Sequence, residues 1–304
     1  MPFRSLLLPL VCLLALALAL APAAAHAATP VIGYGDQRTE MFSDPLFTGL
    51  GIRDSRVVVE WDTFSHPDKT ARLDAWMAAA RAAGVRPLVA IEHSWTPGRQ
   101  KLAPTPAQYT ALIRRLRARY PQARTFSPWN EANHSSQPTA RRPDLAARYW
   151  RLMRAACPGC TVTSPVYLDL ATKSSARWLA AFKKATGGRV RLWAIHGYGD
   201  LNRGTDRHLA ALLKQLPGTV WVTEAAGWVA FGSGWSYDEA RAARSIGYTF
   251  KLVQKYRAKI TRWYFYQWRG GPKGTHWDSG VLGVDGKPRP GYTALKAGLA
   301  RRVR

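Results

Sequence analysis

Two glutamates stand in the sequence contexts that point most clearly to chemistry. Glu131 lies in the run Trp129-Asn130-Glu131, and Glu224 lies in the run Val222-Thr223-Glu224, about ninety residues later. Hydrolysis of a glycosidic bond needs two carboxyl groups, one protonated to assist the leaving oxygen and one ionised to attack the sugar or activate water. Tryptophan-rich flanks exclude water and raise the pKa of a carboxyl group. The pair is therefore our candidate for an acid and a base of one catalytic centre.

Short apolar runs recur along the chain and are separated by helical patterns. Buried parallel strands read as near-continuous apolar runs, whereas strands with one wet face alternate. Eight such runs, without a composition break or a linker between them, predict a single (β/α)8 TIM barrel. The expected strands are residues 31–34, 57–61, 87–91, 125–129, 162–165, 192–195, 220–223 and 263–266.

Helical spacing of apolar residues predicts the elements between these strands. An open doubly wound sheet is the alternative, because Gly33-Tyr34-Gly35 follows the first strand like a dinucleotide loop. Arg38 stands where the third glycine of that loop belongs, which argues against a nucleotide site. The expected helices are residues 70–83, 105–120, 143–156, 175–185, 206–216, 238–256 and 290–300, with a weaker one near 44–50.

Polar and aromatic residues follow the expected strands, and in such a barrel the active site lies at the carboxyl ends of the strands. Aromatic faces suit the apolar faces of sugar rings. The segment 227–237 is either a lid over the active site or a packed loop. Besides the two glutamates, the expected substrate-binding residues are His93, Trp95, Asn130, His196, Tyr198, Trp228 and Trp268.

This constellation resembles the signature of glycoside hydrolase clan A, and its family 5 and family 39 members in particular. The resemblance rests on Asn130-Glu131 after the fourth strand, His196-Gly197-Tyr198 after the sixth, Glu224 after the seventh and Trp268 after the eighth. It spans nearly the whole chain from Gly33 to Tyr292. The Asn-Glu dipeptide alone is a weak signal, but a second glutamate at the right strand end makes a strong one.

The resemblance implies a role for each matching position. Glu131 would be the general acid/base and Glu224 the nucleophile that forms a glycosyl-enzyme intermediate. Asn130 would hydrogen-bond the sugar 2-hydroxyl, and Tyr198 would orient Glu224. Configuration would be retained, with the carboxyl groups roughly 5 Å apart.

His93 and His196 match histidines of the family pattern, and the resemblance implies that Trp268 floors the sugar subsite at the cleavage point. One feature of the pattern is missing. Family members carry an arginine near the first or second strand that braces the nucleophile. We expect Arg56 to begin the second strand, at the wrong end for this role, so the brace stays unassigned. Glu60 and Asp62, at the other end of that strand, are acids without an assigned task.

The sequence predicts no catalytic metal and no cofactor. The seven histidines show no tight ligand spacing such as His-Glu-x-x-His. A Gly-x-Ser-x-Gly elbow, which would favour an esterase, does not occur.

The amino-terminal residues predict export. Arg4 precedes an apolar run from Leu6 to Leu20, and small residues ending at Ala27 follow it. This is a secretory signal peptide, residues 1–27, with residues 28–304 as the catalytic domain. An uncleaved anchor is the alternative, but the apolar run is short for a span of roughly 20 residues. We expect a secreted protein without a membrane span in its mature form.

Two cysteines remain after such cleavage, Cys157 and Cys160, in the motif Cys-Pro-Gly-Cys. In a cytosolic protein this spacing would indicate a redox motif or half of a zinc site. In an exported chain without a second cysteine pair, we expect a local disulfide between a helix and the following strand.

The net charge of +25 allows two other functions. An electrostatic binder of nucleic acid or of an anionic wall polymer would show binding that weakens steeply with salt. A non-catalytic carbohydrate-binding barrel would use the same aromatics without cleavage. Because no nucleic-acid-binding signature accompanies the charge, we expect arginines on helix surfaces and weak attraction to anionic wall polymer. We favour a monomeric glycosidase that acts on a polysaccharide or oligosaccharide.

Overall fold

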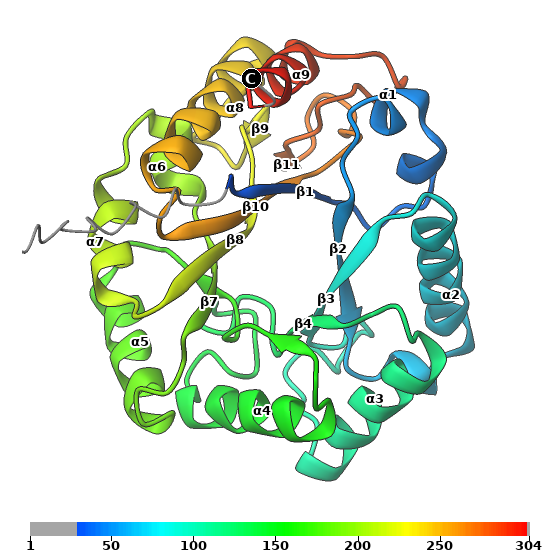
Figure 1. Cartoon of the computed structure of the whole chain (residues 1–304), viewed down its shortest axis with the longest axis vertical. Coiled ribbons are helices and arrows are strands. Elements are labelled where there is room, and N and C mark those ends of the chain that lie inside the picture. Colours follow the sequence, from blue (N-terminus) through cyan, green and yellow to red (C-terminus); the bar gives the residue numbers. More distant parts are fainter. Residues whose placement is uncertain (1–28, 303–304) are drawn as a thin grey trace, which may run out of the picture.

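The computed structural model describes residues 29–302. Parallel strands form a ring at its centre, and helices surround the ring (Figure 1). The expected signal peptide lies outside the described residues. The strands of the ring are β1 (Val31–Gly35), β2 (Asp54–Glu60), β3 (Arg86–Glu92), β4 (Thr125–Ser127), β5 (Thr161–Val162), β6 (Tyr167–Leu168), β7 (Leu192–His196), β8 (Thr219–Ala225) and β10 (Ile260–Tyr266).

The fifth position of the barrel is shared by β5 and β6. The sheet order is β5-β4-β3-β2-β1-β10-β8-β7-β6, so its two ends are neighbouring pieces of one segment. Pro165 lies between them and has no N–H to donate. On one side the Thr163 N–H donates to Phe126 O (3.0 Å), and on the other the Ser164 N–H donates to Leu192 O (2.7 Å). The segment therefore closes the ring, which confirms the predicted (β/α)8 barrel.

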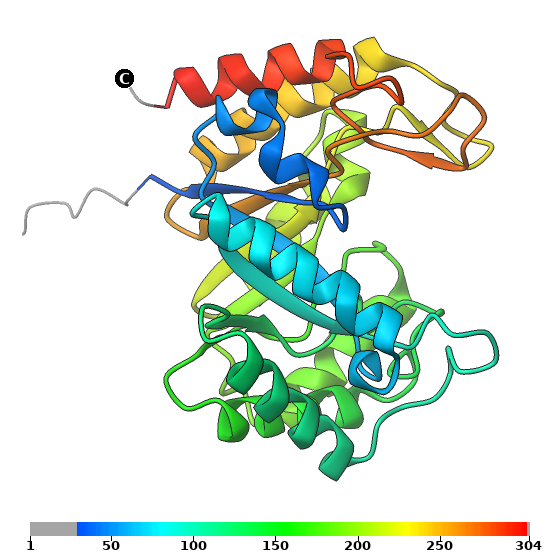
Figure 2. The ribbon, with the colours of Figure 1, turned by 90° about the vertical axis from the view of Figure 1, so that its right-hand side faces the viewer.

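Helices cover the outside of the ring (Figures 1 and 2). Thr105 begins one of them with a capping box, in which its side chain and that of Gln108 accept hydrogen bonds from each other's backbone N–H groups. The weak helix expected near 44–50 is two short turns, and the short helix after β7 was not expected. The helices are η1 (Glu40–Ser43), α1 (Pro45–Thr48), η2 (Thr63–Ser65), α2 (Pro67–Ala82), α3 (Pro106–Arg119), α4 (Pro143–Ala156), α5 (Lys173–Ala185), α6 (Tyr198–Arg203), α7 (Arg207–Gln215), α8 (Glu239–Lys255) and α9 (Pro290–Ala300).

Side chains of alternating strand residues fill the barrel. Leu88, Trp221 and Tyr264 form a buried cluster, separate from the larger core between the strands and the helices. Gly33 makes room for this layer, because a Cβ there would lie 2.4 Å from the Tyr264 ring. This glycine therefore serves packing rather than a nucleotide loop. At the amino-terminal end of β2, Asp54 forms ion pairs with Arg86 (2.6 Å) and Arg262 (2.6 Å).

Basic side chains close several helix ends at the amino-terminal face of the barrel. Arg53 donates to Ala83 O at the end of α2 (3.0 Å), Arg151 to Ala185 O at the end of α5 (3.0 Å) and Lys183 to Gln215 O at the end of α7 (2.8 Å). Cations at these ends oppose the negative pole of each helix dipole. Some of the excess positive charge therefore stabilises helix ends, on the face opposite the carboxyl ends of the strands.

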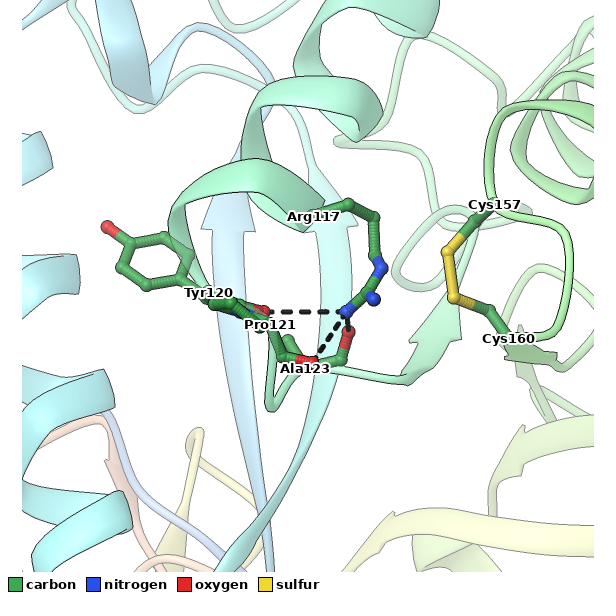
Figure 3. The surroundings of a disulfide bond; sticks show 6 residues. All are labelled: Arg117, Tyr120, Pro121, Ala123, Cys157 and Cys160. Atoms are coloured by element: carbon green, nitrogen blue, oxygen red, sulfur yellow. Dashed lines mark hydrogen bonds between the residues drawn. A yellow bond between two sulfur atoms is a disulfide. The ribbon is translucent and has the colours of Figure 1, made fainter.

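A disulfide links Cys157 and Cys160 on this same amino-terminal face, as the sequence predicted. It joins the end of α4 to the segment that enters β5. Arg117 lies beside it and donates to Pro121 O (2.9 Å) and Ala123 O (2.5 Å), which closes the end of α3 (Figure 3). The disulfide thus fixes a helix-to-strand turn, on the face of the barrel opposite the carboxyl ends of the strands.

The longer loops lie at the opposite face, on the right of Figure 2. Two of them pair as a small antiparallel sheet of β9 (Ala230–Phe231) and β11 (Trp277–Asp278). Within residues 29–302, we find no helix of the length and apolarity that a membrane crossing would need.

Candidate active site

Glu131 and Glu224 meet at the carboxyl-end mouth of the barrel. Glu131 stands in the turn after β4 with a φ of 38°, a left-handed conformation that costs energy in any residue but glycine. Glu224 is near the end of β8. One carboxylate oxygen of each residue and one ring nitrogen of His196 all lie within 4.8 Å of one another. The two acids singled out from the sequence therefore share one site.

An irregularity in β8 turns Glu224 toward this site. The pairing of β8 with β7 shifts register at this point, and so does its pairing with β10. Trp221 faces the barrel interior, so regular alternation would bring Thr223 and Ala225 inward as well. Ala225 instead packs in the core outside the barrel. Bulges commonly re-aim a side chain beside an active site, and this one brings Glu224 inward.

Arg56 contacts Glu224, as the unassigned arginine of the family pattern would. Its Nη1 donates to Glu224 Oε2 (2.5 Å) and its Nη2 donates to Asn130 Oδ1 (2.5 Å). The expectation that Arg56 begins its strand was wrong, because β2 starts at Asp54 and the long side chain of Arg56 runs up the barrel interior. Only 2% of Arg56 is exposed. In the sequence, Arg56, Val58 and Glu60 alternate with Val57 and Val59. This alternation could have shown that Arg56 faces the barrel interior.

Asn130 is fixed from two sides. Its Oδ1 accepts from Arg56, so its Nδ2 must be the donor toward Glu92 Oε1 (3.3 Å). Gln137 Nε2 donates to the same oxygen of Glu92 (3.0 Å). Asn130 Oδ1 accepts from Arg56 and one hydrogen of Nδ2 points to Glu92. The second hydrogen of Nδ2 takes no part in these contacts. Glu92 is a buried acid that joins this network, and the sequence predicted no role for it.

His93 also contacts this network. Its Nδ1 is 3.1 Å from Gln137 Oε1 and 3.4 Å from Glu92 Oε1. Burial acts to lower the pKa of His93, but the hydrogen bond and charge of Glu92 raise it overall. Burial likewise acts to raise the pKa of Glu92, yet hydrogen bonds from His93, Asn130 and Gln137 lower it overall. The structure thus brings His93 next to a buried carboxylate.

Tyr198 and His196 lie against the two glutamates. Tyr198 Oη donates to Glu224 Oε1 (2.5 Å), which is the contact expected for it. His196 Nδ1 lies 2.9 Å from Glu131 Oε1 and 4.0 Å from Glu224 Oε1. His196 is fully buried, and burial lowers its pKa to about 3. It is therefore a neutral ring between the carboxyl groups, without an open face for a sugar.

The environment of Glu131 favours its protonated form. Burial is the largest cause, the charge of Glu92 adds to it, and together they raise the pKa of Glu131 to about 7. The charges of His134 and Arg56 oppose this shift. Glu224, in contrast, receives hydrogen bonds from Arg56 and Tyr198, which stabilise a negative charge on its carboxylate. One glutamate is thus set up as an acid and the other as an anion.

The three tryptophans expected at the substrate lie in different surroundings. Trp95 is 45% exposed, and its indole Nε1 donates to Glu92 Oε2 (3.1 Å). The Trp95 backbone N–H donates to Glu60 Oε2 (2.5 Å), and Lys69 binds the same carboxylate. Glu60, an acid without an assigned task in the sequence, thus holds an open aromatic face at the mouth.

Trp228 is buried and stacks on Tyr198 at a ring distance of 5.7 Å. Phe231, Trp235 and Trp277 pack around it. Of the two alternatives for the segment 227–237, this packing and the β9–β11 pairing favour a packed loop over a lid.

Trp268 corrects the sequence interpretation. Its ring is buried among Tyr34, Phe47 and Tyr292, and its Nε1 donates to Asp44 Oδ2 (2.9 Å). It is not open to a sugar. Tyr266, two residues earlier, faces inward instead, and burial together with the charge of Glu224 raises its pKa. The sequence cannot distinguish two aromatics at one strand end.

A cavity of about 920 Å³ opens beside Glu131. Its walls come from the loop after β6, from α6 and from the β9–β11 pair. Glu131 lines this cavity together with Tyr198, Trp228 and Trp277.

A family model described as glycosyl hydrolase catalytic core matches residues 108–290. The match covers more than half of the chain and includes Glu131, Tyr198 and Glu224. The chain belongs to this family. It is a glycoside hydrolase, and its substrate is therefore a carbohydrate. None of the curated proteins matches the chain significantly.

Solved structures share the fold of this glycoside hydrolase. GH5_18 from Streptomyces cattleya, in complex with GlcNAc, is 18% identical with a TM-score of 0.67, over 91% of this chain and 81% of that one. A family 39 glycoside hydrolase from Bacteroides cellulosilyticus WH2 is 15% identical with a TM-score of 0.59, over 88% and 63%. Xylanase XynB from Paenibacillus barcinonensis is 12% identical with a TM-score of 0.66, over 88% and 95%.

The raised pKa of Glu131 predicts that this glycoside hydrolase loses stability as pH rises. The folded state holds a proton on Glu131 up to about pH 7, whereas the unfolded chain releases it near 4.5. Stability from this proton is complete below 4.5 and is lost through about 7. We expect Glu131→Gln to match the wild type at pH 4 and to be more stable by up to about 3 kcal/mol at pH 8.

Chemical unfolding at the two pH values measures this difference. Glu40→Gln, at an exposed glutamate, is the matched control and should show no such trend. A Glu131→Gln variant that gains nothing at pH 8 would contradict the protonated state of Glu131.

Proposed function

We propose that this enzyme hydrolyses a β-linked sugar with retention of configuration, with Glu131 as acid/base and Glu224 as nucleophile. The observation that carries the proposal is the pair of carboxylate oxygens within 4.8 Å in opposite electrostatic settings. Retaining enzymes hold their carboxyl groups about 5–5.5 Å apart, whereas inverting enzymes leave room for a water between them.

In the first step, a Glu224 oxygen forms a bond to the anomeric carbon while the bond to the leaving oxygen breaks. Glu131 gives its proton to that oxygen. In the second step, Glu131 takes a proton from water, the water oxygen attacks the anomeric carbon, and Glu224 departs as a carboxylate. The raised pKa of Glu131 suits both halves, because an acid/base works best with a pKa near the working pH.

Donors around the nucleophile support this assignment. Arg56 and Tyr198 each give one hydrogen bond to Glu224, one to each oxygen. Arg56 also holds the Asn130 amide, whose remaining N–H would reach a sugar hydroxyl beside Glu224. Fixed donors of this kind act without reorganisation during the reaction.

A metal centre is the second candidate, because Glu131, His196 and Glu224 are close enough to share an ion. The chemistry of the site argues against it. The Arg56 guanidinium already neutralises Glu224, so a divalent cation there would meet a fixed positive charge. The raised pKa of Glu131 also opposes the ionised form that a metal requires. Activity lost on chelation and restored by Zn²⁺ would favour the metal instead.

On the sugar side, the proposed contacts are Trp95, His93, Asn130 and Tyr266. Trp95 offers an exposed ring face that two acids hold in place. The sequence predicts that the substrate is a polysaccharide or an oligosaccharide. We propose that a sugar of this substrate binds on the Trp95 side of the site. A monomer and weak attraction to anionic wall polymer also remain proposals.

The roles of the two glutamates predict different products with azide. Glu224→Ala, assayed on a β-glycoside with a dinitrophenolate leaving group, should be about 10⁴-fold slower and recover with azide as an α-glycosyl azide. Glu131→Ala should form the glycosyl-enzyme, then give a β-glycosyl azide. NMR of the products distinguishes the anomers, with Glu40→Gln as the control. Full activity in both alanine variants would reject the proposal.

Arg56→Lys keeps the charge but cannot donate to Glu224 and Asn130 together. We expect kcat to fall by about 10²-fold, as when one transition-state donor is lost, without global unfolding. Arg53→Lys, at an exposed arginine just before the same strand, is the matched control. Kinetics and circular dichroism measure the two effects. A Lys variant with unchanged kcat would remove the brace role.

Export remains a proposal that the amino-terminal residues motivate. We expect the protein collected from the medium of a secreting host to begin at Ala28, as amino-terminal sequencing would report. A mature protein that keeps Arg4 and the apolar run would favour the anchor instead.

A further inference from the structure

The cavity beside Glu131 is lined by only one of the two glutamates. Under the proposed function, Glu131 delivers its proton to the leaving oxygen, so the leaving group must lie against Glu131. Glu131 is a wall of this cavity of about 920 Å³, whereas Glu224, Asn130 and Trp95 are not. What fills the cavity is therefore the group that departs, and the retained sugar lies on the Trp95 side.

Two segments of the cavity wall contribute large apolar side chains, alongside Asp169 and His276. The loop after β6 contributes Leu168, Leu170 and Ala171, and the β9–β11 pair contributes Phe231 and Trp277. Leu170 is 43% exposed, one of the few large apolar side chains open to solvent within residues 29–302. Ala171 has a φ of 53°, a strained conformation for alanine. The loop thus presents an apolar edge at an energetic cost.

The interior of the cavity is apolar as well. Val222, Leu252 and Trp263 line its depth, in the layer between the barrel and α8. Sugar hydroxyls would need free polar partners here. The acids of the lining are instead engaged internally. Asp200 accepts from the Thr205 hydroxyl (3.0 Å) and the Leu209 N–H (2.9 Å), and Asp169 accepts from the Ala171 N–H (3.2 Å).

The cations of the lining are also partly engaged. Arg203 donates to Gly199 O (3.1 Å) and lies 5.8 Å from the centre of the Trp235 ring. His134 Nδ1 lies 2.7 Å from Ser136 Oγ, which leaves Arg207, His208 and His276 as the basic side chains of the lining that could meet a ligand.

We infer that this cavity is a leaving-group subsite for an apolar aglycone, an alkyl or aromatic group, rather than for a second sugar. The inference rests on the proposed function, which decides that Glu131 faces the leaving group. The enzyme would then release a sugar from an apolar carrier. Apolar area buried in the cavity would stabilise the bound substrate in proportion to its size.

An alkyl series on one sugar tests this subsite. The sugar is the one on which wild-type enzyme cleaves a nitrophenyl β-glycoside fastest, and the series runs from methyl through butyl to octyl β-glycoside. We expect kcat/KM to rise by up to about fourfold for each buried methylene. The matching disaccharides should be cleaved more slowly than the octyl glycoside.

Leu170→Asn should reduce the octyl-to-methyl ratio of kcat/KM several-fold. Val284→Asn is the matched control, because Val284 is 58% exposed and lies outside the cavity lining. Neither variant should alter hydrolysis of the β-glycosyl fluoride of the same sugar, because fluoride needs no aglycone site. This readout also reports that both variants are folded.

The outcomes distinguish failure of the apolar subsite from failure of the proposed function. Fluoride hydrolysis together with a flat alkyl series, or with disaccharides as the better substrates, would overturn the apolar subsite and leave the glycosidase mechanism intact. An unchanged octyl-to-methyl ratio in Leu170→Asn would also overturn it. Failure to cleave any glycosyl fluoride would remove the proposed function, and the subsite with it.

Discussion

The buried guanidinium of Arg56 is the interaction on which the mouth of the barrel depends. A charge this far from water is tolerated only when it is paired and hydrogen-bonded. Glu224 and Asn130 supply the partners, one to each terminal nitrogen. To meet Arg56, β8 must bulge at Glu224, and the turn after β4 must bring Asn130 inward. The site is thus organised around one cation before any substrate arrives.

Arg56 also helps to explain why Glu131 and Glu224 have different electrostatic surroundings. Glu224 receives Arg56 and Tyr198, whereas Glu131 has a neutral histidine beside it and the charge of Glu92 nearby. Glu92 is buried and Glu131 and Glu224 are only partly exposed, so the three carboxyl groups cannot all ionise cheaply next to a single arginine. The proton therefore resides on Glu131, the glutamate with the least support for a negative charge.

The sequence predicted the barrel, the positions of most elements and the meeting of Glu131 with Glu224, because apolar runs and strand ends are local signals. It missed Arg56, because polar residues that line a barrel interior interrupt the apolar run and make the strand look shorter. It misplaced Trp268, because facing depends on a register that composition does not contain. The roles of Glu92 and Glu60 depend on partners from other strands and loops, which no local pattern reveals.

The cations that close the helix ends have a consequence for orientation. Arg53, Arg151 and Lys183 act at the amino-terminal face, with the catalytic mouth at the opposite face. A polyanionic matrix that met this basic face would hold the molecule by its back. The mouth would then point into solution, so that adsorption would immobilise the enzyme without covering the entrance.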